Sequence, residues 1–114
     1  MAKIKTIEQV ESLQKGYRVT ATQESINTGR CWLMEGSVGR FAMGCIESGA
    51  CVLPDHSQRD YYGNTIPSRD QIKKGEIGSL KYCCDFWQRV ADGDDELIDL
   101  LEETFGRDEE DEIA

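Results

Sequence analysis

The stretch from Arg30 to Leu53 constrains the fold most, because it contains three short apolar runs separated by two glycine-bearing breaks. In the middle run Phe41, Met43 and Cys45 fall on one side of an extended chain, and the opposite side is also largely apolar. A period of two is typical of a pleated strand, and two apolar faces are typical of a strand at the centre of a sheet. The stretch therefore predicts three strands, at residues 31–35, 40–46 and 50–53.

The two breaks predict the hairpin turns of this meander. Gly36–Gly39 and Glu47–Gly49 each contain glycine, which can take the positive φ that such turns require. Gly44 lies inside the middle strand and predicts a bulge or a close approach by a helix. Apolar and polar residues alternate over positions 17–23, which predicts a further strand with one solvent-exposed face. The result is an antiparallel sheet of about four strands.

Three helices are expected around this sheet. Thr6 and Gln9 have the spacing of a capping box, and apolar residues recur every three positions after them, which predicts a short helix over residues 6–15. Ser79 is a good N-cap for an amphipathic helix that ends at Ala91. A last helix is expected to begin at Asp94–Asp95 and to end at Thr104, with carboxylates at its positive end.

These expectations combine into one α+β domain. A chain of 114 residues is the size of a single domain, which we place at residues 1–106. The two C-terminal helices are expected to pack on one face of the sheet. Residues 107–114 are acidic and almost without apolar side chains, so they predict a disordered tail.

The charge of the chain is concentrated at its C-terminal end. The formal net charge is −9, yet residues 92–112 alone contain twelve acids and one base and therefore carry −11, which leaves +2 for the rest. Such a block repels nucleic acids and membrane surfaces and attracts basic proteins. No apolar run is long enough to span a membrane, and the N-terminus lacks the apolar core of a secretory signal, so we expect a cytoplasmic protein.

From this charge split we predict a protein that binds a basic, nucleic-acid-handling protein through carboxylates at helical spacing, which take the place of phosphates. The carboxylates expected at the contact are Asp92, Asp94, Asp95, Glu96, Asp99, Glu102 and Glu103. The loop residues Arg59, Tyr61 and Tyr62 are expected to assist, because exposed Tyr and Arg often contribute binding energy. The alternative for the acidic segment is a solvated, solubilising surface.

A second hypothesis is a small cysteine/histidine enzyme or redox protein that uses Cys51 or His56. The position of Cys51 argues against this hypothesis, because Cys51 lies in an apolar run, where thiols are usually inert. A third is a metal-stabilised structural module built on Cys45, Cys51 and His56, although their spacing matches no common zinc pattern. A calcium loop over residues 92–103 is opposed by Leu97, which stands where the loop needs glycine. The five cysteines read most simply as buried apolar side chains.

No catalytic or phosphate-binding motif is present, so we expect a non-enzymatic protein without a cofactor or metal; a homo-oligomer is compatible with the sequence. In size, acidity and lack of a catalytic motif the chain is similar to small intracellular inhibitor proteins, such as toxin immunity proteins and phage-encoded anti-defence proteins. This resemblance is one of composition, and it implies an inhibitor that acts as a nucleic-acid mimic.

Overall fold

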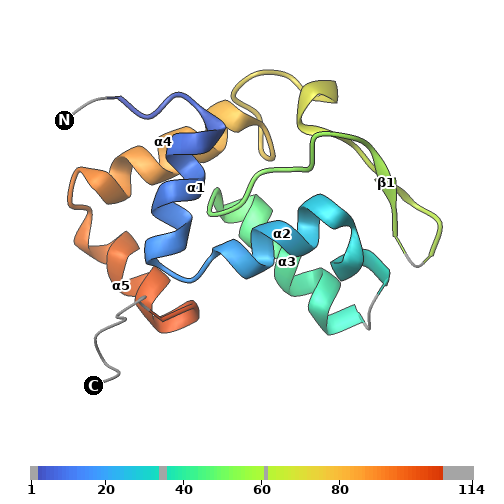
Figure 1. Cartoon of the computed structure of the whole chain (residues 1–114), viewed down its shortest axis with the longest axis horizontal. Helices are drawn as coiled ribbons and strands as arrows, with labels where there is room; N and C mark the ends of the chain where they lie inside the picture. The colour runs from blue at the N-terminus through green and yellow to red at the C-terminus, as the bar shows by residue number, and fades with distance from the viewer. Residues whose placement is uncertain (1–2, 34–35, 61, 107–114) are drawn as a thin grey trace.

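The computed structural model of the chain is mainly helical (Figure 1). It describes residues 3–33, 36–60 and 62–106. The helices are α1 (Ile7–Gly16), α2 (Thr20–Thr28), α3 (Gly36–Ser48), α4 (Leu80–Ala91) and α5 (Asp95–Thr104), with short 3-10 helices η1 (Arg30–Leu33) and η2 (Arg69–Gln71). Within the described residues, the strands are β1 (Gln58–Arg59) and β2 (Thr65–Ile66), paired antiparallel with Gln58 opposite Ile66.

The predicted four-stranded meander, and with it the α+β class, is therefore wrong. Residues 40–46 lie within α3, and the predicted turn at Gly36–Gly39 is the first turn of that helix. The predicted strand at 31–35 is η1 as far as Leu33, and its last two residues lie outside the described part. Of the predicted strand at residues 17–23, residues 17–19 connect α1 to α2 and residues 20–23 are the first turn of α2.

Helix α3 forms because its apolar residues also suit a period of 3.6. Ala42, Cys45 and Ile46 are buried, and their spacing of three and four places them on one helical face. Phe41, which the alternating pattern placed beside Cys45, is 46% exposed instead. Gly44 faces open space, so neither the predicted bulge nor a close helix contact explains it.

The three predicted helices are confirmed, each at the cap that the sequence indicates. Thr6 and Gln9 form the reciprocal capping box of α1. Ser79 accepts the backbone N–H of Tyr82 at the start of α4, and Asp94 accepts that of Leu97 at the start of α5. Helix α4 packs against both α1 and α5, whereas α2 packs against α1, α3 and η1. The two C-terminal helices thus rest on other helices, where a sheet was expected.

The segment Ala50–Leu53 is buried but has no partner strand among the described residues. Side-chain amides form hydrogen bonds with several of its backbone N–H and C=O groups. Val52 donates its N–H to Gln23 Oε1 and accepts from Gln23 Nε2, both at 2.9 Å. The carbonyl of Ala50 accepts from Gln14 Nε2 at 2.9 Å and from the Trp87 indole at 3.0 Å. Because buried backbone groups need partners, these side chains replace the ladder of a sheet.

The remaining backbone groups of this segment bind nearby loops. The Leu53 N–H donates to the carbonyl of Gly78 at 3.1 Å, and its carbonyl accepts from Arg69 Nε at 2.9 Å. The N–H of Cys51 donates to the carbonyl of Cys45, at the end of α3. The segment therefore ties α3 to the loop that precedes α4.

In the part of the chain that the structure describes, no helix is both long enough and apolar enough to cross a membrane. The predicted disordered tail, residues 107–114, lies outside the described residues.

Candidate functional site

Helix α5 separates its apolar and acidic residues onto two sides. Leu101 is buried, and Leu97, Ile98 and Phe105 pack partly buried against the core. The opposite side bears exposed carboxylates. Those that are exposed and form no ion pair with any described residue are Asp95, Glu96, Asp99 and Glu103. The helix therefore presents a group of at least four unneutralised negative charges to the solvent.

The other predicted carboxylates at this end are held by the protein itself. Asp94 accepts from Arg89 Nη2 at 2.8 Å and from Arg89 Nε at 3.2 Å. These bonds, together with the bond from the Leu97 N–H, lower the pKa of Asp94. Asp92 is exposed and accepts from the Gln88 amide at 3.1 Å, whereas Glu102 is half-buried. Asp94 is thus a helix cap and ion-pair partner rather than a free docking charge.

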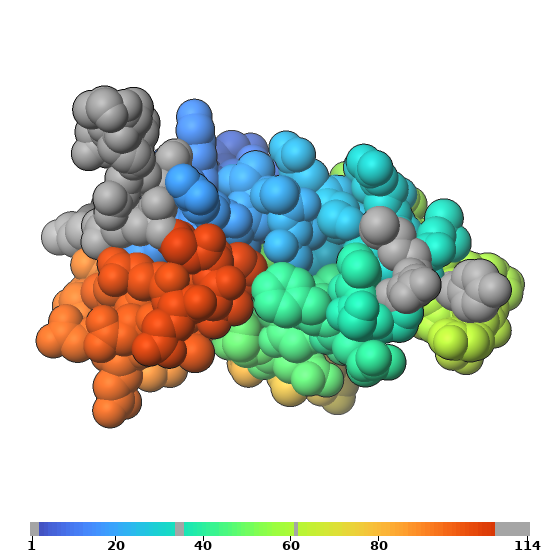
Figure 2. All heavy atoms as spheres, turned by 90° about the horizontal axis from the view of Figure 1, so that it is seen from below, coloured from blue at the N-terminus to red at the C-terminus, as the bar shows by residue number. Residues whose placement is uncertain are grey.

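An apolar groove of about 350 Å³ lies between α5 and α3 (Figure 2, where the orange-red α5 meets the green α3). Phe86 and Leu101 contribute to its walls. Two large apolar side chains stand exposed beside it, Phe41 at 46% and Leu100 at 50%. The ring of Phe41 meets that of Phe105 edge-on, with centroids 5.7 Å apart. The groove therefore places open apolar surface next to the exposed carboxylates.

Sequence reasoning missed this groove because it depends on α3 being helical. Phe41 and Arg40 face the groove only when residues 36–48 form a helix. The strand interpretation instead placed Phe41 on a covered face of a sheet. Leu100 was recoverable from the sequence: it lies off the apolar face marked by Leu97 and Leu101, on the polar side of the helix.

The predicted contact loop lies far from α5, because the β1–β2 hairpin is at the opposite end of the molecule in Figure 1. Asp60 organises the turn by accepting the N–H groups of Tyr62 and Asn64, and Arg59 donates to the carbonyl of Gly63 at 3.2 Å. Tyr62 is 77% exposed and borders a separate hollow of about 210 Å³. Tyr61 lies outside the described residues. The structure does not bring the hairpin and α5 into one surface.

The cysteine/histidine pair lacks an accessible thiol. Cys51 is fully buried, and a hydrogen bond with Cys45, followed by burial, raises its pKa, so it stays a protonated thiol. His56 is instead exposed, with its Nδ1 2.8 Å from Asp55 and its Nε2 facing the Gln58 amide. The five cysteines are free thiols, and all are buried.

The proposed metal ligands do not form a cluster. Within residues 3–33, 36–60 and 62–106, no group of three or more His, Cys, Asp or Glu side chains is arranged to hold a metal ion. The segment considered as a calcium loop is a cap followed by α5.

The chain has no significant match among protein-family models, curated proteins or solved structures. The candidate site is therefore argued from its own geometry.

Proposed function

We propose that the protein is a non-enzymatic binding protein that docks through α5 and the α3–α5 groove onto a basic surface of another protein. The observation that carries the proposal is the juxtaposition of exposed carboxylates with an open apolar groove on one side of the molecule. We call these two features together the docking surface, comprising Asp95, Glu96, Asp99, Glu103, Phe41 and Leu100.

The carboxylates supply attraction and orientation. Charges on one helix face act together over about a Debye length, roughly 8 Å at physiological salt, and they speed the encounter with a cationic partner. Asp94 is neutralised by Arg89, but the four exposed carboxylates of α5 have no such partner among the described residues. Their attraction is consequently available to an external cation.

The groove supplies the apolar anchor that charges alone lack. Solvent-exposed ion pairs contribute little to affinity, whereas a desolvated side chain in a central pocket contributes most of it. Phe41 and Leu100 can enclose an apolar side chain of the partner, while lysines or arginines around that side chain face the carboxylates. Among the described residues that line the groove, Arg40 is the charged one, and it belongs to α3.

The partner that fits this chemistry is a protein whose basic surface binds nucleic acid. A row of carboxylates on such a surface occupies the positions of phosphates and blocks access to DNA or RNA. The proposed role is accordingly that of an inhibitor in the cytoplasm, of the immunity or anti-defence kind.

The experiment is affinity capture from the cells that produce the protein, followed by mass spectrometry. Wild type is compared with a variant in which the exposed carboxylates of α5 are neutralised, D95N/E96Q/D99N/E103Q. We expect wild type to retain a basic protein that duplex DNA displaces, and the variant to lose it.

A matched control carries the same change of net charge, from −9 to −5, at exposed carboxylates on other elements: E8Q/E11Q/E24Q/E76Q. It should capture the partner as wild type does. The smaller pair D99N/E103Q, outside the first turn of α5, guards against loss of the helix and should weaken capture in part. Equal capture by the α5 variant and the control, or no basic protein on wild type, contradicts the proposal.

A further inference from the structure

Cys45 and Cys51 lie beside each other at the end of α3. The N–H of Cys51 donates to the carbonyl of Cys45 at 3.1 Å, and standard backbone dimensions then keep the two Cα atoms within about 7 Å of each other. Their thiols are joined by a hydrogen bond. A disulfide needs Cα atoms no more than about 7 Å apart and side chains that face each other. The fold therefore brings two free thiols into the arrangement that a disulfide requires.

The turn that joins the two cysteines is fixed by its own contacts. Gly49 has a φ of 86° less than a half-turn from extended backbone, in the left-handed region at +104°, and it turns the chain back at the end of α3. A Cβ at Gly49 would lie 2.8 Å from the Cβ of Phe86, so the turn is packed closely against α4. The Cys45 carbonyl also accepts from the Gly49 N–H at 3.3 Å and from the Ser48 hydroxyl at 2.9 Å. These contacts hold Cys51 against Cys45 in the folded chain.

The two thiols differ in their access to solvent. Cys45 is 6% exposed and lines the α3–α5 groove, whose volume of about 350 Å³ admits molecules as small as a peroxide. Cys51 is fully buried and does not line the groove. The hydrogen bond between them lowers the pKa of Cys45 and raises that of Cys51. A thiol with a lowered pKa that meets the solvent beside a second thiol is the usual arrangement of an oxidation-sensitive cysteine.

From these features we infer that Cys45 and Cys51 are a redox-active pair that a peroxide converts to a disulfide. The Cys45 thiolate attacks one oxygen of hydrogen peroxide: an S–O bond forms, the O–O bond breaks, and the leaving hydroxide takes up the proton that Cys45 has lost. The Cys51 sulfur then attacks the Cys45 sulfur, so that an S–S bond forms, the S–O bond breaks, and the hydroxyl leaves as water with the Cys51 proton. Two thiols and one hydrogen peroxide give one disulfide and two waters, and two electrons pass from sulfur to the peroxide.

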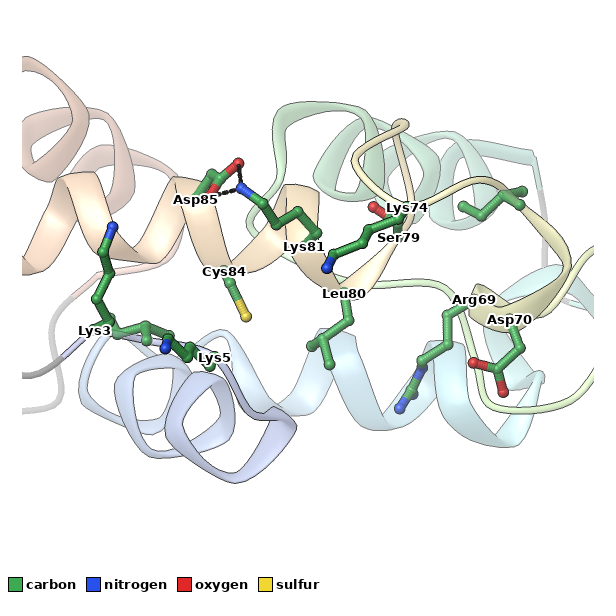
Figure 3. Close-up of a pocket in the computed structure, with 12 residues that line it drawn as sticks. Lys3, Lys5, Arg69, Asp70, Lys74, Ser79, Leu80, Lys81, Cys84 and Asp85 are labelled. Carbon is green, nitrogen blue, oxygen red and sulfur yellow. Dashed lines mark hydrogen bonds and ion pairs between the residues drawn. The ribbon is translucent and has the colours of Figure 1, made fainter.

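The other three cysteines lack this arrangement. Cys31 and Cys83 are close enough to raise the pKa of Cys51 by charge repulsion, but the thiol hydrogen bond of Cys51 is with Cys45. Cys84 lines another hollow, of about 590 Å³, and Figure 3 shows its sulfur on the side of α4 that faces this hollow. Cys83 precedes Cys84 on the helix, so the two side chains point about 100° apart. Cys84 is therefore a suitable control thiol.

The test treats the reduced, folded chain with hydrogen peroxide, stops the reaction with iodoacetamide in urea, and digests the protein with trypsin for mass spectrometry. Trypsin cleaves after Arg40 and after Arg59, so the peptide 41–59 contains both cysteines of the pair and no other cysteine. We expect this peptide to be the first to escape alkylation and to have two hydrogens fewer than its reduced form. Dithiothreitol should restore both thiols. The peptides that contain the other three cysteines should still be alkylated.

Three variants separate the roles of the two thiols. Cys51→Ser keeps the thiol at the groove but removes its partner, so oxidation of Cys45 should stop at the sulfenic acid, which dimedone traps. Cys45→Ser should leave Cys51 reduced over the time in which wild type closes the disulfide. The matched control Cys84→Ser removes another buried thiol that lines a hollow, and its peptide 41–59 should oxidise as in wild type. Equal melting temperatures establish that the variants fold.

The inference is overturned if peptide 41–59 keeps both thiols in peroxide, if Cys45 or Cys51 first joins a cysteine of another peptide, or if Cys84→Ser slows the reaction as much as Cys45→Ser does. The peptide analysis of wild type needs no variant, so it decides the question even where a substitution unfolds the chain. Because its readout is the oxidation state of one peptide, the outcome is independent of the partner-capture experiment.

Discussion

Replacing Gln23 by leucine tests the feature that holds the centre of this fold together. Gln23 is buried, and its amide binds both the N–H and the carbonyl of Val52 at 2.9 Å. Leucine has a similar size but no polar atoms, so the variant leaves both backbone groups of Val52 buried without a partner. Each such group costs about 1–3 kcal/mol, so the free energy of unfolding should fall by about 4 kcal/mol.

Two comparisons sharpen this expectation. Gln14→Leu should cost less, about 1–2 kcal/mol, because the Ala50 carbonyl keeps its bond from Trp87 at 3.0 Å. Glu24→Leu changes the neighbouring exposed residue of α2 and should stay within about 0.5 kcal/mol of wild type. The measurement is urea unfolding followed by circular dichroism and by tryptophan fluorescence. A loss below about 1 kcal/mol for Gln23→Leu, or a larger loss for Gln14→Leu, would refute the reasoning.

Further outcomes concern the groove, the thiols and Asp94. Leu100→Ser should reduce partner capture about tenfold or more. Leu33→Ser should not, because Leu33, which is 65% exposed against 50% for Leu100, does not line the groove; equal capture by the two variants would contradict a role for the groove. Iodoacetamide should label the folded protein slowly, and it should label Cys45 before Cys51. The hydrogen bond between the two thiols lowers the pKa of Cys45 and raises that of Cys51. Rapid labelling of Cys51 would support the enzyme hypothesis instead. The pKa of Asp94 is lowered in the folded protein, so the ionised carboxylate stabilises the fold above the ordinary pKa of 3.8, and this contribution is lost as the pH falls through the folded pKa. Wild type should therefore have a higher free energy of unfolding than Asp94→Asn at neutral pH. A difference in the free energy of unfolding that persists in strong acid would contradict this.

The helices that the sequence predicts correctly are those with a local start signal. Thr6, Ser79 and Asp94 each cap a helix through a side-chain bond to the backbone N–H three residues ahead, and such bonds depend on neighbours alone. The apolar period that follows each cap is also a local property. The acidic side of α5 could be predicted for the same reason, since it follows from spacing along one helix.

The strand predictions were wrong where the decisive contacts are distant in sequence. Residues 40–46 are apolar on both sides of an extended chain, and the same residues place Ala42, Cys45 and Ile46 on one helical face, so the pattern alone does not choose. Packing against η1 and α2 decides in favour of the helix, despite glycines at positions 36, 39 and 44. Tertiary contacts here override the low helix propensity of glycine.

Residues 50–53 show a different failure. They are buried and apolar like a central strand, but their backbone partners are Gln14 and Gln23, polar residues that pattern reasoning assigns to the surface. The groove could not be predicted for a related reason. It joins Phe41 and Leu100, which are far apart in the chain, and although the spacing in α5 sets Leu100 off its apolar face, nothing in the sequence indicates that Phe41 lies beside it.

The docking surface is tested most directly by titrating the 15N-labelled protein with a cationic amphipathic helical peptide of lysine and leucine repeats. We expect amide shifts concentrated in α5 and the groove side of α3, weaker at high salt, absent in D95N/E96Q/D99N/E103Q and retained in E8Q/E11Q/E24Q/E76Q. Shifts spread over the acidic residues of α1 and α2, or equal shifts in the two variants, would contradict a docking surface at α5.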